Sequence, residues 1–253
     1  MSKLLVTRAG AVTTITFNQP DRKNAVDYEM TLAMKSALEA AAADDSRVVV
    51  ITGAGADFCS GADLKSVTQI SDVTGYLRTV TNPTILAMRS MPKPVIAKVR
   101  GVAVGLGCNY ALACDLRIAS TDARFGQIFA RIGLMPDGGS TYFLPRMTGY
   151  ARAFEWMLTA DLYDARRCFD MGIVNRVVDP SGLDAAVDEL AHRLAEGPAL
   201  AYANIKRALN AGDAGTLADS LDREAVGQKQ CIESADFREG VQAFLEKRKA
   251  KFR

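Results

Sequence analysis

Residues 95–115 read VIAKVRGVAVGLGCNYALACD and carry the strongest fold signal in the sequence. Their apolar start predicts a buried strand, and Gly101, Gly105 and Gly107 predict a turn that leads into a helix. The helix is apolar on nearly all sides, so we expect it to be buried. Its first turn would point free N–H groups into the interior, where they can hold an anion or an oxygen that becomes one. The same glycines would also suit a helix that only packs tightly against a strand, and this stretch alone favours that simpler interpretation.

Composition excludes several classes of protein. The chain has 253 residues, of which 49% are hydrophobic, and a net charge of +2. This length allows one large domain or two modest ones, and the near-neutral charge gives no reason to expect nucleic acid as a partner. We expect no membrane association, because no apolar run reaches the ~20 residues of a membrane span and the N-terminus lacks a signal peptide. Five scattered cysteines without a CxxC motif disfavour disulfides and zinc sites and favour a reducing, cytoplasmic location.

The single histidine, His192, narrows the chemistry further. It falls in a helical pattern over 183–195, where a surface or half-buried position is expected. Without a second histidine, Ser–His or Cys–His catalysis and histidine-based metal sites are disfavoured, so we expect no metal. Catalysis then depends on carboxylates, backbone donors, Lys or Tyr.

The predicted strands lie in the first two-thirds of the chain, and helices dominate its end. Alternation around Gly10 predicts a hairpin, and Pro83 predicts a break or kink in a helix. We therefore expect an α/β core with a helical C-terminal part. The predicted strands are 4–8, 12–17, 48–52, 95–99, 116–119 and 173–178. The predicted helices are 27–43 with Asp27 as N-cap, 73–90, 105–113, 128–132, 141–147, 151–159 and 163–171, and everything from 181 onward is predicted to be helical. Residues 125–127 are a predicted turn.

Common nucleotide-binding and hydrolase motifs are absent. Gly105-Leu106-Gly107 begins a dinucleotide-binding pattern, but Tyr110 takes the place of the third glycine and no acidic residue follows at the ribose-binding distance. The chain has neither GxxxxGK[ST] nor GxSxG.

A second glycine-bearing turn has the sequence DFCSGADLK at residues 57–65. Together with Gly105-Leu106-Gly107-Cys108 it resembles the crotonase family of enoyl-CoA hydratases and isomerases. Each matching segment is weak alone, but in this order they are specific, and they span essentially the whole chain. The other segments are NQP at 18–20 with Asn24-Ala25, MPKPVIA at 91–97, ARFG at 123–126, and FREG at 237–240 continuing to Arg248.

The resemblance implies an α/β fold with a crotonase-like spiral of strand–strand–helix repeats over 1–197. It also implies a helical region over 198–253 that assembles a homotrimer or a dimer of trimers. The substrate would be an acyl-CoA thioester, so coenzyme A is part of the substrate and no cofactor is expected. By position, the backbone N–H groups of Ala62 and Leu106 would form an oxyanion hole. Such donors stay fixed and neutral while negative charge builds on the thioester oxygen.

Departures from the family pattern bear on the reaction. Hydratase members carry two glutamates at the positions of Asn109 and Phe129, and neither residue present here can exchange a proton near neutral pH. Asp137 lies where isomerase members, including ring-epoxide isomerases of phenylacetyl-CoA, carry an acidic residue. The resemblance thus implies that Asp137 is catalytic. Because Asp137 precedes Gly-Gly-Ser, the simpler alternative is a helix N-cap or turn residue.

The resemblance also implies residues that contact the substrate. Lys65 is a candidate for a CoA phosphate, as are Lys247 or Arg248 of a neighbouring subunit, although all three could equally belong to a solvated basic face. Asp63 has the alternative of capping a helix near Leu64. The candidates for CoA binding are Lys23, Ala25, Ala62, Asp63, Leu64 and Lys65. The candidates for the acyl pocket are Asn109, Phe129 and Leu134. Tyr142 and Trp156 would either lie in the core or line this pocket.

The predicted function is that of a CoA-thioester isomerase, which shifts a double bond or rearranges a ring through an enolate held in the oxyanion hole. The alternatives are an enoyl-CoA hydratase and an inactive family member that only binds acyl-CoA. Phe237, Val241, Phe244 and Leu245 form an apolar stripe on a predicted helix that is otherwise charged. This stripe either folds back on its own core or meets a neighbouring subunit.

Overall fold

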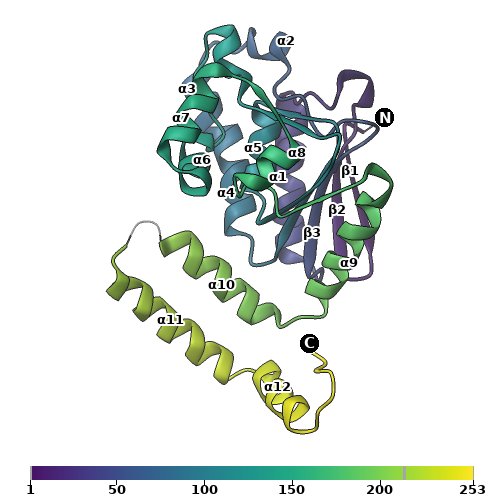
Figure 1. Ribbon diagram of the computed structural model, residues 1–253, viewed down its shortest axis with the longest axis vertical. Coiled ribbons are helices and arrows are strands. Elements are labelled where there is room, and N and C mark those ends of the chain that lie inside the picture. Colours follow the sequence, from purple (N-terminus) through teal and green to yellow (C-terminus); the bar gives the residue numbers. More distant parts are fainter. Residues whose placement is uncertain (1, 213–214, 253) are drawn as a thin grey trace.

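The computed structural model describes residues 2–212 and 215–252. Its main sheet has six strands in the order β1-β2-β3-β4-β6-β9 (Figure 1). β1 pairs with β2 in an antiparallel hairpin, and the other neighbours pair in parallel. The strands are β1 (Leu4–Ala9), β2 (Val12–Phe17), β3 (Val48–Gly53), β4 (Val95–Val99), β6 (Leu116–Ser120) and β9 (Arg176–Val178). The predicted strands are confirmed, although β9 is three residues shorter than expected.

A second sheet of three short strands has the order β5-β7-β8. It contains β5 (Val102–Val104), β7 (Arg124–Gly126) and β8 (Leu162–Asp164). β4 and β5 are consecutive strands in different sheets, and so are β6 and β7. This gives the strand–strand–helix repeat, with α5 (Leu106–Ala113) following β5. Gly101 permits the turn between β4 and β5, because its φ is +52° and a Cβ there would lie 2.2 Å from the carbonyl oxygen of Ala56.

Three local predictions are corrected by this second sheet. Residues 102–104 form a strand within the predicted glycine-rich turn, and the predicted turn at 125–127 is largely strand β7. The predicted helix 163–171 divides into β8 and α8 (Ala165–Asp170). Three-residue strands are too short to show alternation, and their hydrogen-bond partners lie far away in the sequence.

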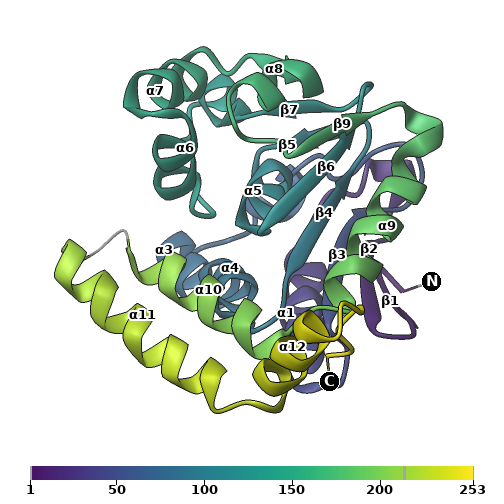
Figure 2. The same ribbon diagram turned by 60° about the horizontal axis from the view of Figure 1, so that its bottom comes forward.

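Helices cover both faces of the six-stranded sheet. α1 (Tyr28–Ala43) places Met30, Met34 and Leu38 in the larger core, and the predicted N-cap Asp27 accepts a hydrogen bond from the N–H of Met30 at 2.9 Å. α9 (Leu183–Ala195) packs its apolar side in a second cluster against the opposite face (Figure 2). Since every residue of β3 is buried, the sheet forms the centre of the protein.

The segment 73–90 is a helix interrupted by a π-helical turn. α3 (Val73–Tyr76) continues into the π-helical segment η2 (Leu77–Thr81) and then into α4 (Asn82–Ser90), with Pro83 in the first turn of α4. The predicted break is confirmed, because proline lacks an N–H and is best tolerated where a helical segment begins.

The helical C-terminal part comprises α10 (Ala199–Gly212), α11 (Leu217–Ile232) and α12 (Ala235–Leu245). α10 and α11 form a helix pair that extends beyond the α/β core (Figures 1 and 2). Asp115 anchors α10 through an ion pair with Lys206 at 2.7 Å and contacts Arg89 at 3.3 Å, while Arg89 also contacts Asn210. α10 begins one residue after the predicted boundary at 198, and the division into two regions stays a prediction. Residues 1, 213, 214 and 253 of those regions lie outside the described residues.

The remaining elements are short helices in the upper part of the molecule and between strands. They are α2 (Leu64–Val67), α6 (Ser140–Thr148), α7 (Tyr150–Thr159), and the 3-10 helices η1 (Pro20–Arg22), η3 (Ile128–Ile132) and η4 (Pro180–Gly182).

Of the residues that the structure describes, none belongs to a helix long and apolar enough to cross a membrane.

Candidate active site

The two glycine-bearing turns lie against each other. Cys59 pairs with β5 in a short parallel bridge: its N–H donates to Val102 and its carbonyl accepts from Val104, at 2.9 and 3.1 Å. Gly61 follows with a φ of +96°, and a Cβ there would lie 2.9 Å from the Val104 carbonyl and 3.4 Å from the Leu106 nitrogen. Only glycine lets the first turn approach the start of α5 this closely.

Helix α5 begins at this contact and is entirely buried, as predicted. Its N-cap is Gly105, without a side-chain cap, and a Cβ on Gly107 would lie 2.2 Å from the Cys59 carbonyl oxygen. Within the described residues, the N–H groups of Ala62 and Leu106 donate no hydrogen bond. The bridge to Val26 uses the groups on either side of Ala62, and Leu106 is the first residue of α5. The structure thus brings together two free backbone donors, one of them at a helix N-terminus.

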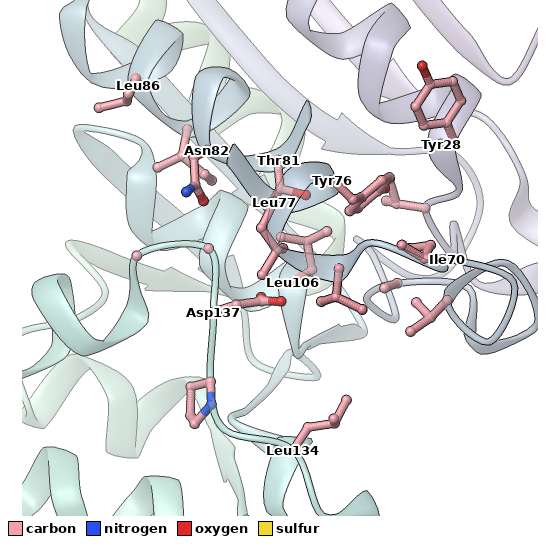
Figure 3. A pocket seen from close by; sticks show the side chains of 18 of the residues that line it. Tyr28, Ile70, Tyr76, Leu77, Thr81, Asn82, Leu86, Leu106, Leu134 and Asp137 are labelled. Atoms are coloured by element: carbon pink, nitrogen blue, oxygen red, sulfur yellow. The ribbon is translucent and has the colours of Figure 1, made fainter. Parts of the chain in front are cut away.

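Both donors border a cavity of about 1240 Å³. Its walls come from the start of α1, residues 62–70, the helix of 73–90, the loop 134–139, α6 and Asn210 of α10. Most of these residues are apolar. Figure 3 shows Leu106 and Asp137 close together in the opening, with Leu77 and Thr81 on the neighbouring wall and Leu134 on another.

Asp137 lies in the loop between η3 and α6. The N-cap of α6 is Gly139, with no side-chain cap, and the Asp137 backbone carbonyl accepts from the N–H of Ser140 at 3.2 Å. The Asp137 side chain therefore does not cap this helix, but Asp137 does begin the turn that leads into it, which was the other half of that alternative. Its Oδ1 is buried and has no hydrogen-bond partner in the described chain, and burial raises the pKa of Asp137 to about 6. A half-buried carboxyl group with such a pKa can exchange protons near neutral pH.

A pair of buried amides holds Asp137 in place. Asn109 on α5 donates from Nδ2 to the backbone carbonyl of Asp137 at 2.8 Å. Its Oδ1 accepts from Nε2 of Gln127, also at 2.8 Å, and both amide residues are fully buried. Asn109 thus connects Asp137 to the helix that carries the Leu106 N–H. Sequence reasoning missed Gln127, since a polar residue in a predicted turn gives no sign of burial.

The three acyl-pocket candidates occupy different places. Leu134 lines the cavity, whereas Asn109 and Phe129 lie behind its lining. The Phe129 ring supports the Gly105 turn, 3.9 Å from where a Cβ of that glycine would be. Tyr142 also lines the cavity, but Trp156 is in the core, where it stacks on Tyr163 with ring centroids 4.6 Å apart.

The CoA-binding candidates lie on two chain segments that contact each other near the Gly61 turn. The Lys23 carbonyl accepts from the N–H of Ser60 at 2.9 Å, which joins the 20–26 loop to the Gly61 turn. Ala62 lines the cavity, while Lys23, Leu64 and Lys65 are exposed beside it, and Ala25 is half-buried.

Two of the basic or acidic candidates already have partners in this chain. Asp63 caps α2, as its alternative predicted, by accepting from the N–H of Lys65 at 3.2 Å, and it pairs with Arg22 at 2.6 Å. Arg248 pairs with Glu239 at 2.6 Å. Lys247 follows α12, near the C-terminus.

The cysteines and the single histidine do not line this cavity. The five cysteines are free thiols, and His192 is exposed on α9, as expected. Residues 2–212 and 215–252 contain no group of three His, Cys, Asp or Glu side chains that could hold a metal ion.

Comparisons with a family model, with named proteins and with solved structures agree on one family. Residues 7–253 match the family model described as enoyl-CoA hydratase/isomerase. The chain is 41% identical to a Rhodobacter capsulatus protein named "Probable enoyl-CoA hydratase", covering 94% of this chain and 93% of that one. It is 38% identical to the 1,2-epoxyphenylacetyl-CoA isomerase of Escherichia coli, covering 95% and 94%. The crystal structure of an enoyl-CoA hydratase from Polaromonas sp. JS666 matches with a TM-score of 0.94 and 32% identity, covering 99% of each chain.

Proposed function

The chain belongs to the enoyl-CoA hydratase/isomerase family, and on this premise we propose that it is a CoA-thioester isomerase. One observation carries the proposal: Asp137 is a carboxylate without a partner for Oδ1, in a largely apolar cavity that also contains the free N–H groups of Ala62 and Leu106. A general base and an oxyanion hole are the two components that an enolate mechanism needs. Such an enzyme shifts a double bond, or rearranges a ring, without adding water.

The proposed reaction begins when the thioester oxygen accepts hydrogen bonds from Ala62 and Leu106. The Asp137 carboxylate then removes a proton from the carbon beside the thioester carbonyl, and the electron pair of that C–H bond forms an enolate. The N–H groups stabilise the developing charge on oxygen. The Asp137 carboxyl group returns the proton two carbons further along, which moves the double bond and regenerates the carboxylate.

The amides near Asp137 favour isomerisation over hydration. Asn109 stands at one of the two positions where hydratase members carry a glutamate. Its amide nitrogen donates to the Asp137 carbonyl, and its amide oxygen accepts from Gln127. Phe129 occupies the second such position and is buried. Hydration requires an oriented, activated water, and neither side chain exchanges a proton near neutral pH. An enoyl-CoA hydratase remains the second candidate, because the 41% identical relative carries that name.

A turnover screen over a panel of acyl-CoA thioesters tests the proposal. Conversion of a 3-enoyl-CoA into its 2-enoyl isomer supports the isomerase. Faster addition of water to a 2-enoyl-CoA supports the hydratase instead. Binding of acyl-CoA without turnover of any member of the panel supports an inactive binding protein.

The activity is expected to depend on pH through Asp137. Burial raises its pKa from 3.8 to about 6, and only the ionised form acts as a base. kcat/KM should therefore fall about tenfold for each pH unit below 6 and level off above it. A profile measured from pH 4.5 to 8 with a 3-enoyl-CoA checks this. A flat profile between pH 5 and 7 would contradict a buried carboxylate base.

The apolar stripe on α12 supports an oligomer. Phe244 and Leu245 are 83% and 74% exposed, and Phe237 and Val241 are 45% and 43% exposed, so the stripe is not covered by its own core. We expect a homotrimer or a dimer of trimers, in which Lys247 or Arg248 comes near the CoA of a neighbouring subunit.

Replacing Phe244 with Asp should dissociate the oligomer, because the charge would be buried in the interface. Gln242→Asp, on an exposed part of the same helix, is the matched control and should leave the assembly intact. Light scattering at micromolar concentrations measures both variants. A monomeric wild-type protein would rule out this assembly.

A further inference from the structure

A buried positive charge lies at the far end of α5, and the proposed reaction does not use it. Arg117 on β6 is 5% exposed, and within the described residues its guanidinium group donates hydrogen bonds to backbone carbonyl oxygens alone. The carboxylate of Asp115 pairs with Lys206 and Arg89 instead. The oxygens that accept from Arg117 are the carbonyls of Ala111, Leu112, Cys114, Asp115 and Ile173.

These hydrogen bonds satisfy the C-terminal end of α5. Ala111 and Leu112 belong to its last turn and Cys114 is its C-cap, and the last carbonyls of a helix have no partner within the helix. A neutral donor would satisfy such carbonyls as well, whereas a buried charge without a carboxylate partner costs stability. Burial accordingly lowers the pKa of Arg117, but an arginine side chain stays protonated in proteins. The charge itself therefore requires an explanation beyond hydrogen bonding.

Helix α5 connects this charge to the oxyanion hole. The helix has eight residues, so at 1.5 Å per residue the guanidinium group lies about 12 Å behind the Leu106 N–H. All eight residues are buried, and charges interact more strongly through such an interior than through water. Burial raises the pKa of Cys108, in the first turn of α5, to about 12, and the charge of Arg117 opposes that rise. The field of Arg117 thus reaches the end of the helix that carries the hole.

We propose that the buried charge of Arg117 stabilises the enolate from the far end of α5, in addition to the N–H groups of Ala62 and Leu106. The inference rests on the proposed function, since it assumes that an enolate forms at these two groups. Arg117 does not touch the substrate, so its effect depends on its charge and not on a contact. With an effective dielectric constant of about 20, a unit charge at about 12 Å favours the enolate over the neutral thioester about tenfold.

Acetoacetyl-CoA is a suitable probe, because the acidic carbon beside its thioester carbonyl forms an enolate that absorbs in the near ultraviolet. Titrating the bound thioester spectroscopically gives the pH midpoint of enolate formation without any turnover. Arg117→Gln keeps an amide donor but removes the charge, so its midpoint should lie about one pH unit higher than that of the wild type, a tenfold loss. Arg117→Lys keeps the charge, and its enolate stabilisation should stay within about twofold of the wild type.

A variant of the neighbouring carboxylate separates the charge from the contacts. Asp115→Asn removes a negative charge beside Arg117 and keeps an acceptor for the N–H of Val95. Its midpoint should lie below that of the wild type, a change that damage to the oxyanion hole does not produce. Asp115→Asn also decides the question if Arg117→Gln does not fold, which thermal unfolding shows.

Three results would overturn the inference. They are an unchanged midpoint in folded Arg117→Gln, an equal rise in Arg117→Gln and Arg117→Lys, and a midpoint in Asp115→Asn that is not lower than that of the wild type. An equal rise in both Arg117 variants is the result expected if the side chain only holds the carbonyls of α5. The proposed function fails separately, if no 3-enoyl-CoA is turned over although the bound probe forms its enolate.

Discussion

Replacing Asp137 with Asn is expected to reduce isomerase turnover by about 10²–10⁴-fold, the usual contribution of general acid–base catalysis. The amide has nearly the same shape but cannot accept the proton. The variant should fold normally, because the Asp137 contacts with Asn109 and Ser140 are made by its backbone carbonyl. Single-turnover and steady-state assays with a 3-enoyl-CoA measure the loss. Wild-type turnover in a folded Asp137→Asn protein would rule out this mechanism.

The same substitution should stabilise the protein near neutral pH. The pKa of Asp137 is raised from 3.8 to about 6 by burial, so the folded state binds its proton more tightly than the unfolded state. Ionisation therefore costs stability, as much as about 3 kcal/mol above pH 6, and this cost disappears as the pH falls toward 4. The unfolding free energies of the variant and the wild type should diverge as pH rises from 4.5 to 7. Asp188→Asn, on the exposed side of α9, is the control for the Asp-to-Asn exchange itself.

Replacing Ala62 with Pro is expected to reduce turnover by about 10²–10³-fold, the cost of losing one oxyanion-hole donor. Proline removes the N–H at this position. The fold should tolerate the change, because the bridge to Val26 uses the Gly61 carbonyl and the Asp63 N–H rather than the N–H of Ala62. Ala62→Ser keeps the donor and adds little volume, so it is the matched control with near-normal turnover.

Circular dichroism and thermal unfolding must show that Ala62→Pro is folded before its kinetics are interpreted. Full activity in that folded protein would exclude Ala62 from the oxyanion hole. Gly107→Val is expected to damage turnover as well, but it is a less specific test. A Cβ at Gly107 would lie 2.2 Å from the Cys59 carbonyl oxygen, so any side chain there displaces the whole turn.

Elements with strong local signals were predictable from the sequence. The hairpin around Gly10 follows from alternation over consecutive residues, and α1 follows from apolar spacing that begins after the capping Asp27. The buried helix α5 follows from its nearly uniform apolar character. Each of these signals depends on residues within a few positions of one another, so no knowledge of tertiary contacts is needed.

The short strands β5 and β7 were not predictable in this way. They pair with each other over three residues, and the pairing exists because Gly101 lets the chain turn from one sheet into the other. A three-residue run carries too little periodicity to distinguish a strand from a turn. Their positions depend on partners that are more than 20 residues away in the sequence.

The sequence by itself determined the fold class, the family and the identity of the candidate residues, because caps, glycine turns and apolar periodicity act over short distances along the chain. Only the tertiary structure decided the environment of those residues. It left Oδ1 of Asp137 buried without a partner and connected Asn109 to Gln127. Burial and hydrogen bonding at Asp137 come from segments separated by many residues in the chain. Its raised pKa therefore arises only after α5 and the 134–139 loop have packed together.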